Sequence, residues 1–449
     1  MVKRREIVMK TIKKLIACFA FLVLTTAAAF SIMPYVAKVD DTGYSSFAGA
    51  LDEWTNGTTL TLLADVTVSS TIYIGGEDDY TTEQYTLDLN NYGIMFTGTN
   101  GSVIDIRPSK KLILNDSAET KTDRYITLNA QGRGVSVSNT GTESSTCVKV
   151  TGGYITGGNA DDGGGVSTEY NANGFTMNSG TIAGNIAGYG GGIYLEMGDI
   201  VIKGNSKIIK NTATVQGGGV YAYGTYLTVS DSPQIIGNVK SGEASNVFLC
   251  HNSYDEYISF DDPLTADARI GVSAEFSHYH TGVITWFLNG NQTDAKGTVS
   301  NFLSDDPAYT VVLNSSGEAV LVPFVTVTAN VDPNNTGTYY ATFYDSTKKY
   351  LAGSNTEVYY ATANANGKLT LTKVESKIIK AGEGVILKST SASIVLTETS
   401  ENATYDSILT GSDTATTVTN ALVLSNGESG VSFYKYTGSV AAHKAWLTE

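Results

Sequence analysis

The acidic pair Asp161-Asp162 is the place in this chain where carboxylates come closest to a catalytic arrangement. Enzymes that cleave polysaccharides place several carboxylates around the scissile bond, or combine a Ca²⁺ held by carboxylates with a basic residue that removes a proton. The positions one and two periods of 27 residues later, 188–189 and 215–216, hold no carboxylate. The sequence therefore predicts no catalytic residue and no cofactor. Asp161 and Asp162 form either a solvated turn or part of a binding surface. The acidic pairs scattered through the chain leave Ca²⁺ binding possible.

In a second pattern, a tyrosine is followed two residues later by a glutamate or a tyrosine, in two segments that lie 27 residues apart. Its members are Tyr194, Glu196, Tyr221 and Tyr223. Aromatic faces stack on sugar rings, and neighbouring oxygen atoms accept hydrogen bonds from hydroxyl groups. The pattern predicts either a strip that binds a glycan or a protein, or an ordinary sheet face that tyrosines cover.

The histidines do not indicate a metal site or a nucleophilic triad. His278 and His280 would place two imidazoles on one face of a strand, but the neighbouring sequence offers no third ligand. No serine or cysteine nucleophile motif accompanies any of the four histidines. We therefore expect no metal site.

Both patterns lie in a region that repeats every 27 residues. Three columns share this spacing: the glycine triplets 163–165, 190–192 and 217–219, the isoleucines Ile155, Ile182, Ile209 and Ile236, and the apolar residues Val148, Phe175, Ile202 and Val229. The repeated units alternate with period two and are rich in β-forming residues, which favours strands over helices. A repeat of this length predicts a solenoid in which each period forms one coil.

The isoleucine column is expected to stack inside the solenoid, where each buried aliphatic side chain contributes about 1.5–3 kcal/mol. Each glycine triplet precedes an inward apolar residue and is therefore expected at a corner between two strands. The corner needs a positive φ, and a side chain there would collide with the same corner of the next coil, about 4.8 Å away. A phosphate-binding loop is the alternative, but no helical segment follows the glycines.

The segment 184–194 resembles the right-handed parallel β-helix repeats of bacterial surface proteins, including adhesin-like and polymorphic-outer-membrane-type families. Residues 47–66 resemble the N-terminal capping coil of such proteins, and 246–249 with 270–272 resemble their closing coils. The resemblance covers residues 44–322 and implies a parallel β-helix, which we expect to have eight to ten coils. It leaves function open, because this scaffold serves adhesins and polysaccharide-cleaving enzymes alike.

The 27-residue period ends near Pro323. Residues 324–449 read as short alternating strands separated by turns, which predicts a β-sandwich-like domain. The passages 378–388 and 430–447 resemble a β-domain that occurs near the C-terminus of secreted Bacteroidetes proteins. The fold class expected for the whole chain is therefore all-β, with a parallel β-helix followed by this second domain.

Residues 1–30 combine six basic residues, an apolar run and a small-residue cleavage site, which predicts a secretory signal peptide. The alternatives are a retained membrane anchor, for which the apolar run is short, and lipid attachment at Cys18, although this cysteine opens the apolar run instead of following it. Removing residues 1–30 changes the net charge from −15 to −20. This charge disfavours nucleic acid and anionic lipid as partners, and we expect no transmembrane segment after cleavage.

Two cysteines, Cys147 and Cys250, follow the signal segment. About four stacked coils would separate them by roughly 19 Å, too far for a disulfide. Both are expected to be buried apolar residues.

Taken together, the sequence predicts a protein of the extracellular space or bacterial cell surface that binds an extracellular glycan or a surface protein without catalysis. The candidate binding residues are Tyr194, Glu196, Tyr221, Tyr223, Asp161 and Asp162. A polysaccharide-cleaving enzyme and a structural stalk are the two alternatives.

Overall fold

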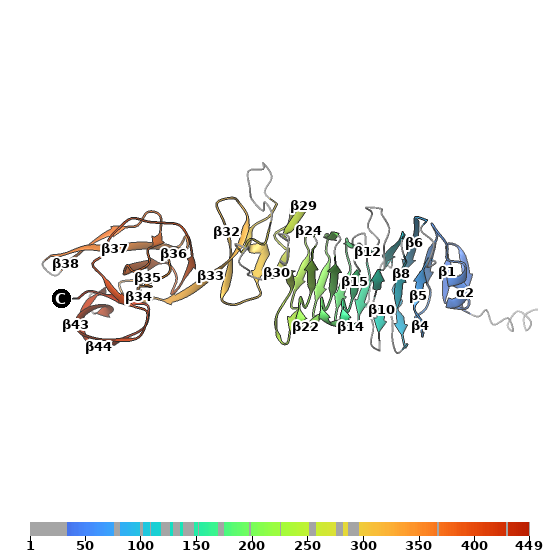
Figure 1. Cartoon of the computed structure of the whole chain (residues 1–449), viewed down its shortest axis with the longest axis horizontal. Coiled ribbons are helices and arrows are strands. Elements are labelled where there is room, and N and C mark those ends of the chain that lie inside the picture. Colours follow the sequence, from blue (N-terminus) through green and yellow to red (C-terminus); the bar gives the residue numbers. More distant parts are fainter. Residues whose placement is uncertain are drawn as a thin grey trace, which may run out of the picture.

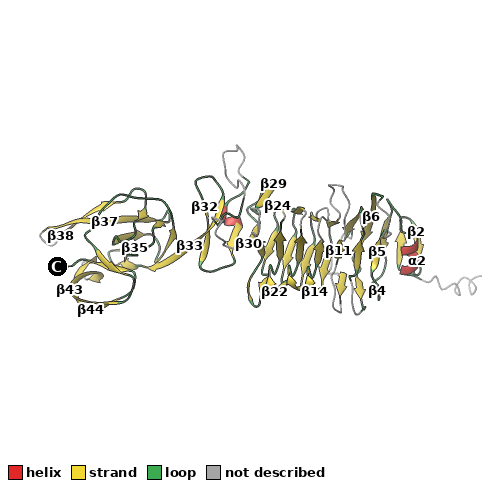
Figure 2. Cartoon of the chain, in the orientation of Figure 1, coloured by secondary structure: helices red, strands yellow, loops and turns green. Residues whose placement is uncertain are grey.

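The structure is a computed structural model in which the chain is nearly all β, with 58% of residues in strands and 3% in helices. It describes residues 34–75, 81–98, 102–107, 109–117, 126–128, 135–137, 148–150, 152–168, 175–196, 199–224, 226–250, 257–274, 282–285, 296–365, 368–427 and 430–448. The expected signal peptide, Cys147, His278 and His280 lie outside these residues. Figure 1 shows an elongated molecule with stacked parallel strands in one half and antiparallel sheets in the other, and Figure 2 shows how little helix it contains.

The first half is a parallel β-solenoid of the right-handed type with about 6 turns. One sheet consists, in spatial order, of β2 (Thr42–Tyr44), β1 (Ala37–Val39), β3 (Thr59–Leu62), β6 (Glu83–Asp88), β9 (Lys110–Asn115), β12 (Val148–Val150), β16 (Phe175–Met177), β20 (Asp199–Ile202), β24 (Tyr226–Asp231) and β29 (Ile258–Leu264). From β3 onward its strands pair in parallel.

Two further walls of the solenoid join at β30 (Arg269–Ala274), which pairs with both β25 and β28. One wall contains β4 (Val66–Val68), β7 (Ile94–Phe96), β10 (Ile126–Leu128), β13 (Tyr154–Thr156), β17 (Thr181–Ala183), β21 (Lys207–Ile209) and β25 (Gln234–Ile236). The other contains β5 (Ile72–Ile74), β8 (Ile104–Ile106), β11 (Val135–Val137), β15 (Val166–Thr168), β19 (Ile193–Glu196), β23 (Val220–Tyr223) and β28 (Val247–Cys250). At the closing end, β31 (Phe302–Ser304) pairs with β30 and follows the short 3-10 helix η1 (Val299–Asn301).

A small sheet lies along the corner between these two walls. It consists of β14 (Asn159–Asp162), β18 (Ile186–Tyr189), β22 (Thr212–Gln216), β26 (Val239–Lys240) and β27 (Glu243–Ala244). A complete coil therefore passes through four short strands, for example β16, β17, β18 and β19, before the chain enters the next coil at β20.

The solenoid has fewer turns than the eight to ten expected from a uniform 27-residue period. Several coils are longer, because Leu112 pairs with Val148, 36 residues later, and Val229 pairs with Phe260, 31 residues later. The longer connections consume chain without adding a turn.

The apolar columns form the core, but two of the expected stackings were wrong in register. Ile155 pairs with Ile182 as predicted. Ile182, however, pairs with Ile208, and Ile208 pairs with Ile235, so each partner lies one residue before the predicted Ile209 or Ile236. Since neighbouring strand residues point to opposite faces, this shift makes Ile208 and Ile235 fully buried. Similarly, Phe175 pairs with Ile200, and Ile202 pairs with Met177. The coil between these positions is shorter than 27 residues.

A β-bulge restores the last residue of the 27-residue spacing, which is shortened to 25 residues between Phe175 and Ile200 and to 26 between Ile182 and Ile208. Ala187 pairs with Ala213, but Tyr189 pairs with Gln216, so β22 contains one residue more than β18 between these pairs. The 27-residue spacing is thereby restored for the column Val166, Ile193, Val220 and Val247, which pairs without a shift.

The glycine triplets lie at the corners, as predicted. The first glycine of each triplet has a positive φ of 61° at Gly163, 60° at Gly190 and 67° at Gly217. The second and third approach the next coil: a Cβ on Gly191 would lie 2.4 Å from the Thr212 carbonyl oxygen. The first glycine of each triplet is therefore needed for its positive φ, and the second and third are needed because the next coil approaches closely.

A buried asparagine ladder follows the same corner. Asn185, Asn211 and Asn238 are fully buried, and each donates its backbone N–H and its side-chain amide to the Oδ1 of the next asparagine in the ladder at 2.9–3.1 Å. Asn246 receives the last of these pairs. Every rung thus satisfies polar groups that would otherwise be buried without partners.

The helix α2 (Phe47–Asp52) lies at the N-terminal end of the solenoid, where the sequence predicts a cap over the first coil. The Ser46 hydroxyl accepts a hydrogen bond from the Gly49 N–H at 3.1 Å and caps the helix. Trp54 meets Tyr85 edge to face, with ring centroids 5.5 Å apart. The antiparallel strands β1 and β2 complete this end.

The second half consists of antiparallel sheets. One contains β32 (Tyr309–Leu313), β33 (Ala319–Thr328), β41 (Ser393–Glu398), β36 (Tyr350–Ala352) and β39 (Ile378–Ile379), and the other contains β34 (Asn330–Asp332), β35 (Asn335–Phe343), β40 (Val385–Ser389), β37 (Thr356–Ala365) and β38 (Lys368–Lys373). Both sheets contribute to one buried cluster that includes Phe343, Val358, Leu387 and Leu396. The packing is that of a β-sandwich.

Two antiparallel pairs complete this half: the hairpin of β43 (Thr416–Gly427) with β44 (Gly430–Val440), and the pair that flanks it in the sequence, β42 (Thr410–Ser412) with β45 (Lys444–Trp446). The single strand β33 connects the two halves, because its residues up to Pro323 pair with β32 and those from Phe324 pair with β41. The change of partner thus lies between Pro323 and Phe324.

Candidate functional site

The candidate site is built on the outer face of the wall that contains β15, β19, β23 and β28. Along each strand the side chains alternate, so the residue after each inward Val or Ile points outward. The outward row reads Ser167, Tyr194, Tyr221, Phe248 and Ser273 in consecutive strands. Parallel pairing in register thus brings together three aromatic residues that are 27 positions apart in the sequence.

The three aromatic rings form a stack. The ring centroids of Tyr194 and Tyr221 are 5.6 Å apart with an interplanar angle of 4°, and those of Tyr221 and Phe248 are 5.6 Å apart at 6°. Tyr189 of β18 meets Tyr221 edge to face at 5.0 Å. We call the residues Tyr189, Tyr194, Glu196, Tyr221, Tyr223 and Phe248 the tyrosine strip.

The second outward row lies two residues further along the same strands. Glu196 pairs with Tyr223, which in turn pairs with Cys250. The Tyr221 hydroxyl donates a hydrogen bond to the Sγ of Cys250 at 3.2 Å, which ties the two rows together. Cys250 is buried, as the sequence analysis expected.

Burial divides the strip into a base and a rim. Tyr221 and Phe248 are buried, with 8% and 6% exposure, and form a small apolar cluster with Cys250. Tyr194 and Tyr223 are half-buried against this cluster, and Tyr189 is 36% exposed. The base therefore supports the strip, and the rim presents groups to solvent.

The pKa values of the tyrosines reflect these surroundings. Burial, together with the nearby carboxylates of Glu196 and Asp162, raises the pKa of Tyr194 to about 12. Burial and the hydrogen bond to Cys250 also raise the pKa of Tyr221. Both hydroxyls are thus protonated donors at neutral pH.

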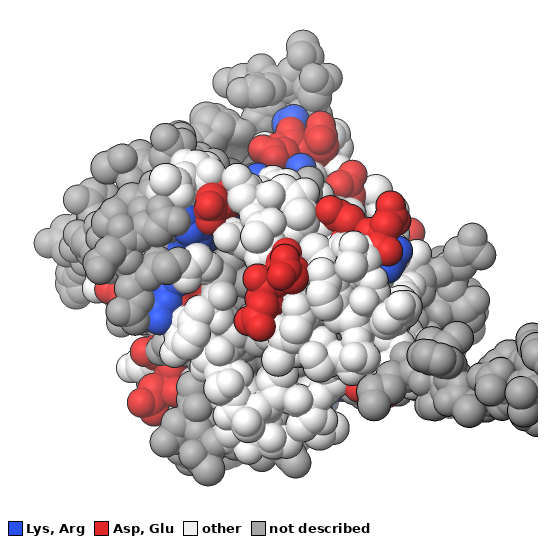
Figure 3. All heavy atoms as spheres, turned by 90° about the vertical axis from the view of Figure 1, so that its right-hand side faces the viewer, with Lys and Arg blue, Asp and Glu red and all other residues white. Residues whose placement is uncertain are grey.

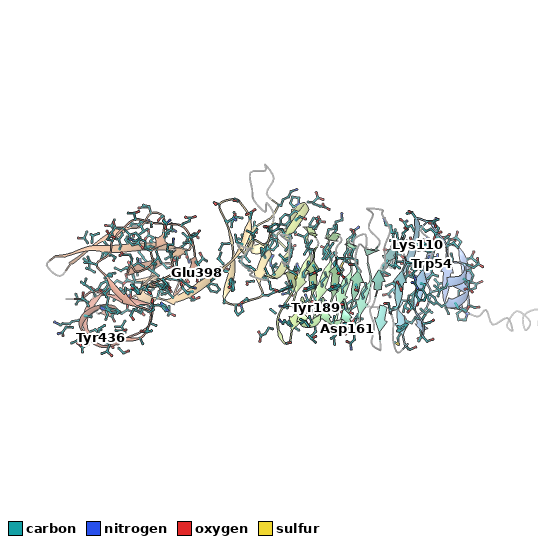
Figure 4. The ribbon with its side chains drawn as sticks, in the orientation of Figure 1. Trp54, Lys110, Asp161, Tyr189, Glu398 and Tyr436 are labelled. Carbon is teal, nitrogen blue, oxygen red and sulfur yellow. The ribbon has the colours of Figure 1, made fainter. Side chains whose placement is uncertain are left out.

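The structure places Asp162 beside the strip and Asp161 at its edge. In the small sheet, Asp162 pairs with Tyr189, and Tyr189 pairs with Gln216. Asp161 is exposed. Figure 4 shows Asp161 and Tyr189 at the same edge of the solenoid.

Four of the six residues of the tyrosine strip were predicted from the sequence, whereas Tyr189 and Phe248 were not. Phe248 is 27 residues after Tyr221, so the period itself identifies it once the closing coil is counted as part of the repeat. Tyr189 belongs to a different sheet, and only the bend of the coil at the glycine triplet brings its ring to Tyr221.

The groups of the strip suit contact with a ligand. Its ring stack, hydroxyl donors and carboxylate acceptors suit hydrogen bonding and apolar contact with a ligand. A hydrolase would need two carboxyl groups on opposite sides of a scissile bond. Among the described residues of the solenoid, no group of three His, Cys, Asp or Glu side chains converges on one point.

In the second half of the chain, among the described residues, the possible ligand atoms of Asp345, Asp413 and His443 lie within 4.8 Å of one another. The Asp345 carboxylate accepts hydrogen bonds from the N–H groups of Thr347 and Lys348 at 2.9 and 2.8 Å. His443 Nδ1 lies 3.1 Å from the Tyr344 carbonyl oxygen. The Ser346 N–H donates to the Asp413 carboxylate at 3.0 Å, so hydrogen bonds involving all three residues connect this turn to its neighbouring segments.

No helix among the described residues is long and apolar enough to cross a membrane. Comparison of the chain with protein-family models found no match. Comparison with curated proteins and with solved structures also found none. The geometry of the strip is therefore the basis for any functional conclusion.

Proposed function

We propose that this protein is a secreted or cell-surface, adhesin-like binding protein without catalytic activity, and that the tyrosine strip contacts an extracellular glycan or a surface protein. The proposal rests on one observation: parallel register aligns aromatic rings with carboxylates on an outer face of a rigid solenoid. A row of this kind suits an extended ligand, because its contacts repeat along the solenoid axis.

The charge of the site favours a neutral or basic ligand. Glu196 and Asp162 both lie near Tyr194 and raise its pKa, so a ligand at this ring meets negative charge. The chain as a whole carries −15, and Figure 3 shows more Asp and Glu than Lys and Arg on the N-terminal end of the solenoid. An acidic ligand would be repelled, whereas sugar hydroxyls can donate to the carboxylates.

Binding to a glycan array, followed by titration calorimetry of each hit, tests the proposal. The variant Tyr194→Ser with Glu196→Gln should lose affinity for the ligand by roughly tenfold or more, since each lost contact to a charged group corresponds to about 1.5–3 kcal/mol. Tyr73→Ser is the matched control, because Tyr73 is an exposed tyrosine in the same outward row, four strands away from Tyr194. Equal affinity of the strip variant and the wild type would refute the assignment.

Mass spectrometry of polysaccharides incubated with the protein and Ca²⁺ separates binding from catalysis. We expect no released fragments from plant, mucin or microbial polysaccharides. Release from any of them would replace the adhesin-like proposal with the enzyme alternative, and Asp161 and Asp162 would be the first residues to substitute.

A stalk function is the second candidate, and the elongated arrangement in Figure 1 favours it. The solenoid and the sandwich are connected through the single strand β33. If the solenoid only positions the sandwich, substitutions in the tyrosine strip will leave ligand binding unchanged, and substitutions in the sandwich will abolish it.

A further inference from the structure

The second half of the chain contains a cavity that the tyrosine strip does not involve. It has a volume of about 210 Å³ and lies where β43, β44 and β45 meet β33, β34 and β35. This volume is below the roughly 300–1,000 Å³ typical of pockets for drug-sized ligands. The cavity therefore suits a small molecule or one end group of a larger one.

Lys444 is the charged residue among the described lining of this cavity. Its Nζ lies 3.5 Å from the Thr328 carbonyl oxygen, a long contact for a hydrogen bond. No ion pair among the described residues includes Lys444, and the described lining contains no acidic side chain. Lys444 thus brings a positive charge to a lining whose described residues include no carboxylate.

The partial burial of Lys444 changes its pKa. It lowers the pKa of Lys444, because the charged form loses contact with water. A carboxylate in the cavity would offset that loss by pairing with the ammonium group. The charge and the cavity together select an anionic ligand, in a protein whose overall charge is strongly negative.

The remaining lining suits a polyhydroxylated ring. Thr342 and Ser439 contribute hydroxyl groups, and Asn330 contributes an amide. Tyr436 is 39% exposed, and its own hydroxyl donates to the Ser439 carbonyl oxygen at 3.2 Å, which holds the ring in place. Val440 adds an apolar surface for the C–H face of a sugar. Figure 4 shows Tyr436 on the C-terminal half, far from Tyr189 on the solenoid.

We propose that this cavity binds the carboxylate-bearing residue of an acidic sugar, with Lys444 pairing with the carboxylate and Tyr436 lying against the sugar ring. The site is separate from the tyrosine strip, and the proposal does not depend on the function of that strip. Free sugar acids and the acidic ends of glycan chains share this chemistry.

Titration calorimetry of the purified protein with glucuronate, with glucose and with an oligosaccharide that ends in glucuronate tests the proposal. Glucuronate should bind at least tenfold more tightly than glucose. Tighter binding of the oligosaccharide than of glucuronate would identify a glycan end as the source, and equal binding would identify the free acid. A short peptide with a free C-terminal carboxylate is the fourth ligand, and its tighter binding would overturn the assignment to a sugar.

The variant Lys444→Met keeps the aliphatic stem and removes the charge, so it should fold at least as stably as the wild type. It should lose affinity for glucuronate by roughly 10- to 100-fold. Lys435→Met, an exposed lysine on β44 outside the cavity, is the matched control and should bind like the wild type. Unchanged binding by Lys444→Met, or no binding of glucuronate by the wild type, would overturn the proposal.

The pH dependence supplies a second measurement that does not rely on a variant. Lys444 is the cation in the cavity, and the Tyr436 hydroxyl is the other titratable group in its described lining. The affinity for glucuronate should stay constant between the pKa of its own carboxyl group and the lowered pKa of Lys444. It should fall as the pH rises through the pKa of Lys444, because the neutral amine cannot pair with a carboxylate. Affinity that stays constant up to the usual lysine pKa of about 10.4 would contradict the role of Lys444.

Discussion

Asn246 donates both its backbone N–H and its side-chain amide to the carboxylate of Asp305, each at 2.6 Å. The buried asparagine ladder thus ends on a group that has only acceptor atoms when it is ionised. Each asparagine of the ladder donates as well as accepts, whereas Asp305, the group at the end, has no further member of the ladder to which it could donate. A carboxylate is the side chain that satisfies this end of the ladder without adding a donor.

Asn211→Ala should destabilise the solenoid. It removes the acceptor that the backbone N–H and the side-chain amide of Asn185 share. The amide keeps the carbonyl oxygens of Ile155 and Ala183, whereas the buried N–H is left without a partner, which costs about 1–3 kcal/mol. Urea unfolding followed by circular dichroism measures the loss. Asn205→Ala is the control, because Asn205 is exposed beside the same coil and should change stability little. Similar stabilities of the two variants would show that the ladder contributes nothing.

Stability should decrease as the pH rises through the titration of Asp305. Burial outweighs the hydrogen bonds from Asn246 and raises the pKa of this carboxyl group in the folded protein. A raised folded pKa means that the associated stability is fully present below the unfolded pKa, about 3.9, and is lost as the pH rises through the folded value. Unfolding free energies measured across this range should show the decrease in the wild type and in the exposed control Asp262→Asn. Asp305→Asn should remove it, and persistence of the decrease would assign it to another group.

Gly191→Ala should destabilise the protein more than Gly237→Ala. A Cβ at Gly191 would lie 2.4 Å from the Thr212 carbonyl oxygen, so the coils must move apart, at a cost of about 1–3 kcal/mol or more. Gly237 has a positive φ of 69°, which Gly191 does not have, but a Cβ at Gly237 meets nothing within 4 Å, so only the backbone strain of about 1–2 kcal/mol remains. Thermal unfolding of the two variants compares these costs. The reverse order would mean that the corner geometry is not set by the close approach of the coils.

Phe248→Ala should expose the thiol of Cys250 and destabilise the strip. Phe248 stacks on Tyr221, and removing a buried phenylalanine costs about 3–5 kcal/mol. In a Cys147→Ser background, the reaction of Cys250 with a thiol reagent should become faster in the variant. Leu303→Ala, at a 47% exposed position, is the control and should leave the reaction rate unchanged. An unchanged rate in Phe248→Ala would show that other groups shield the thiol.

The 27-residue period and the glycine triplets were sufficient to predict the parallel solenoid and the corner positions. This succeeded because each coil repeats the same local constraint: Gly190 needs a positive φ, and Gly191 needs room for the next backbone. Tyr194 and Tyr221 were correctly aligned for the same reason, since their strands pair in the register that the glycines set.

The tertiary structure alone decided the rest. Because the spacing at Ile182 is one residue shorter than 27, Ile208 enters the core in place of Ile209. The bulge in β22 then restores the 27-residue spacing. A fixed period cannot predict either change. Tyr189 joins Tyr221, and Asn246 meets Asp305, across different sheets or distant segments. The sequence by itself determined the features that repeat along the chain, because stacking applies one local rule to every coil. Contacts across corners and at the end of the stack depend on how the coils bend and close, and only the folded chain specifies them.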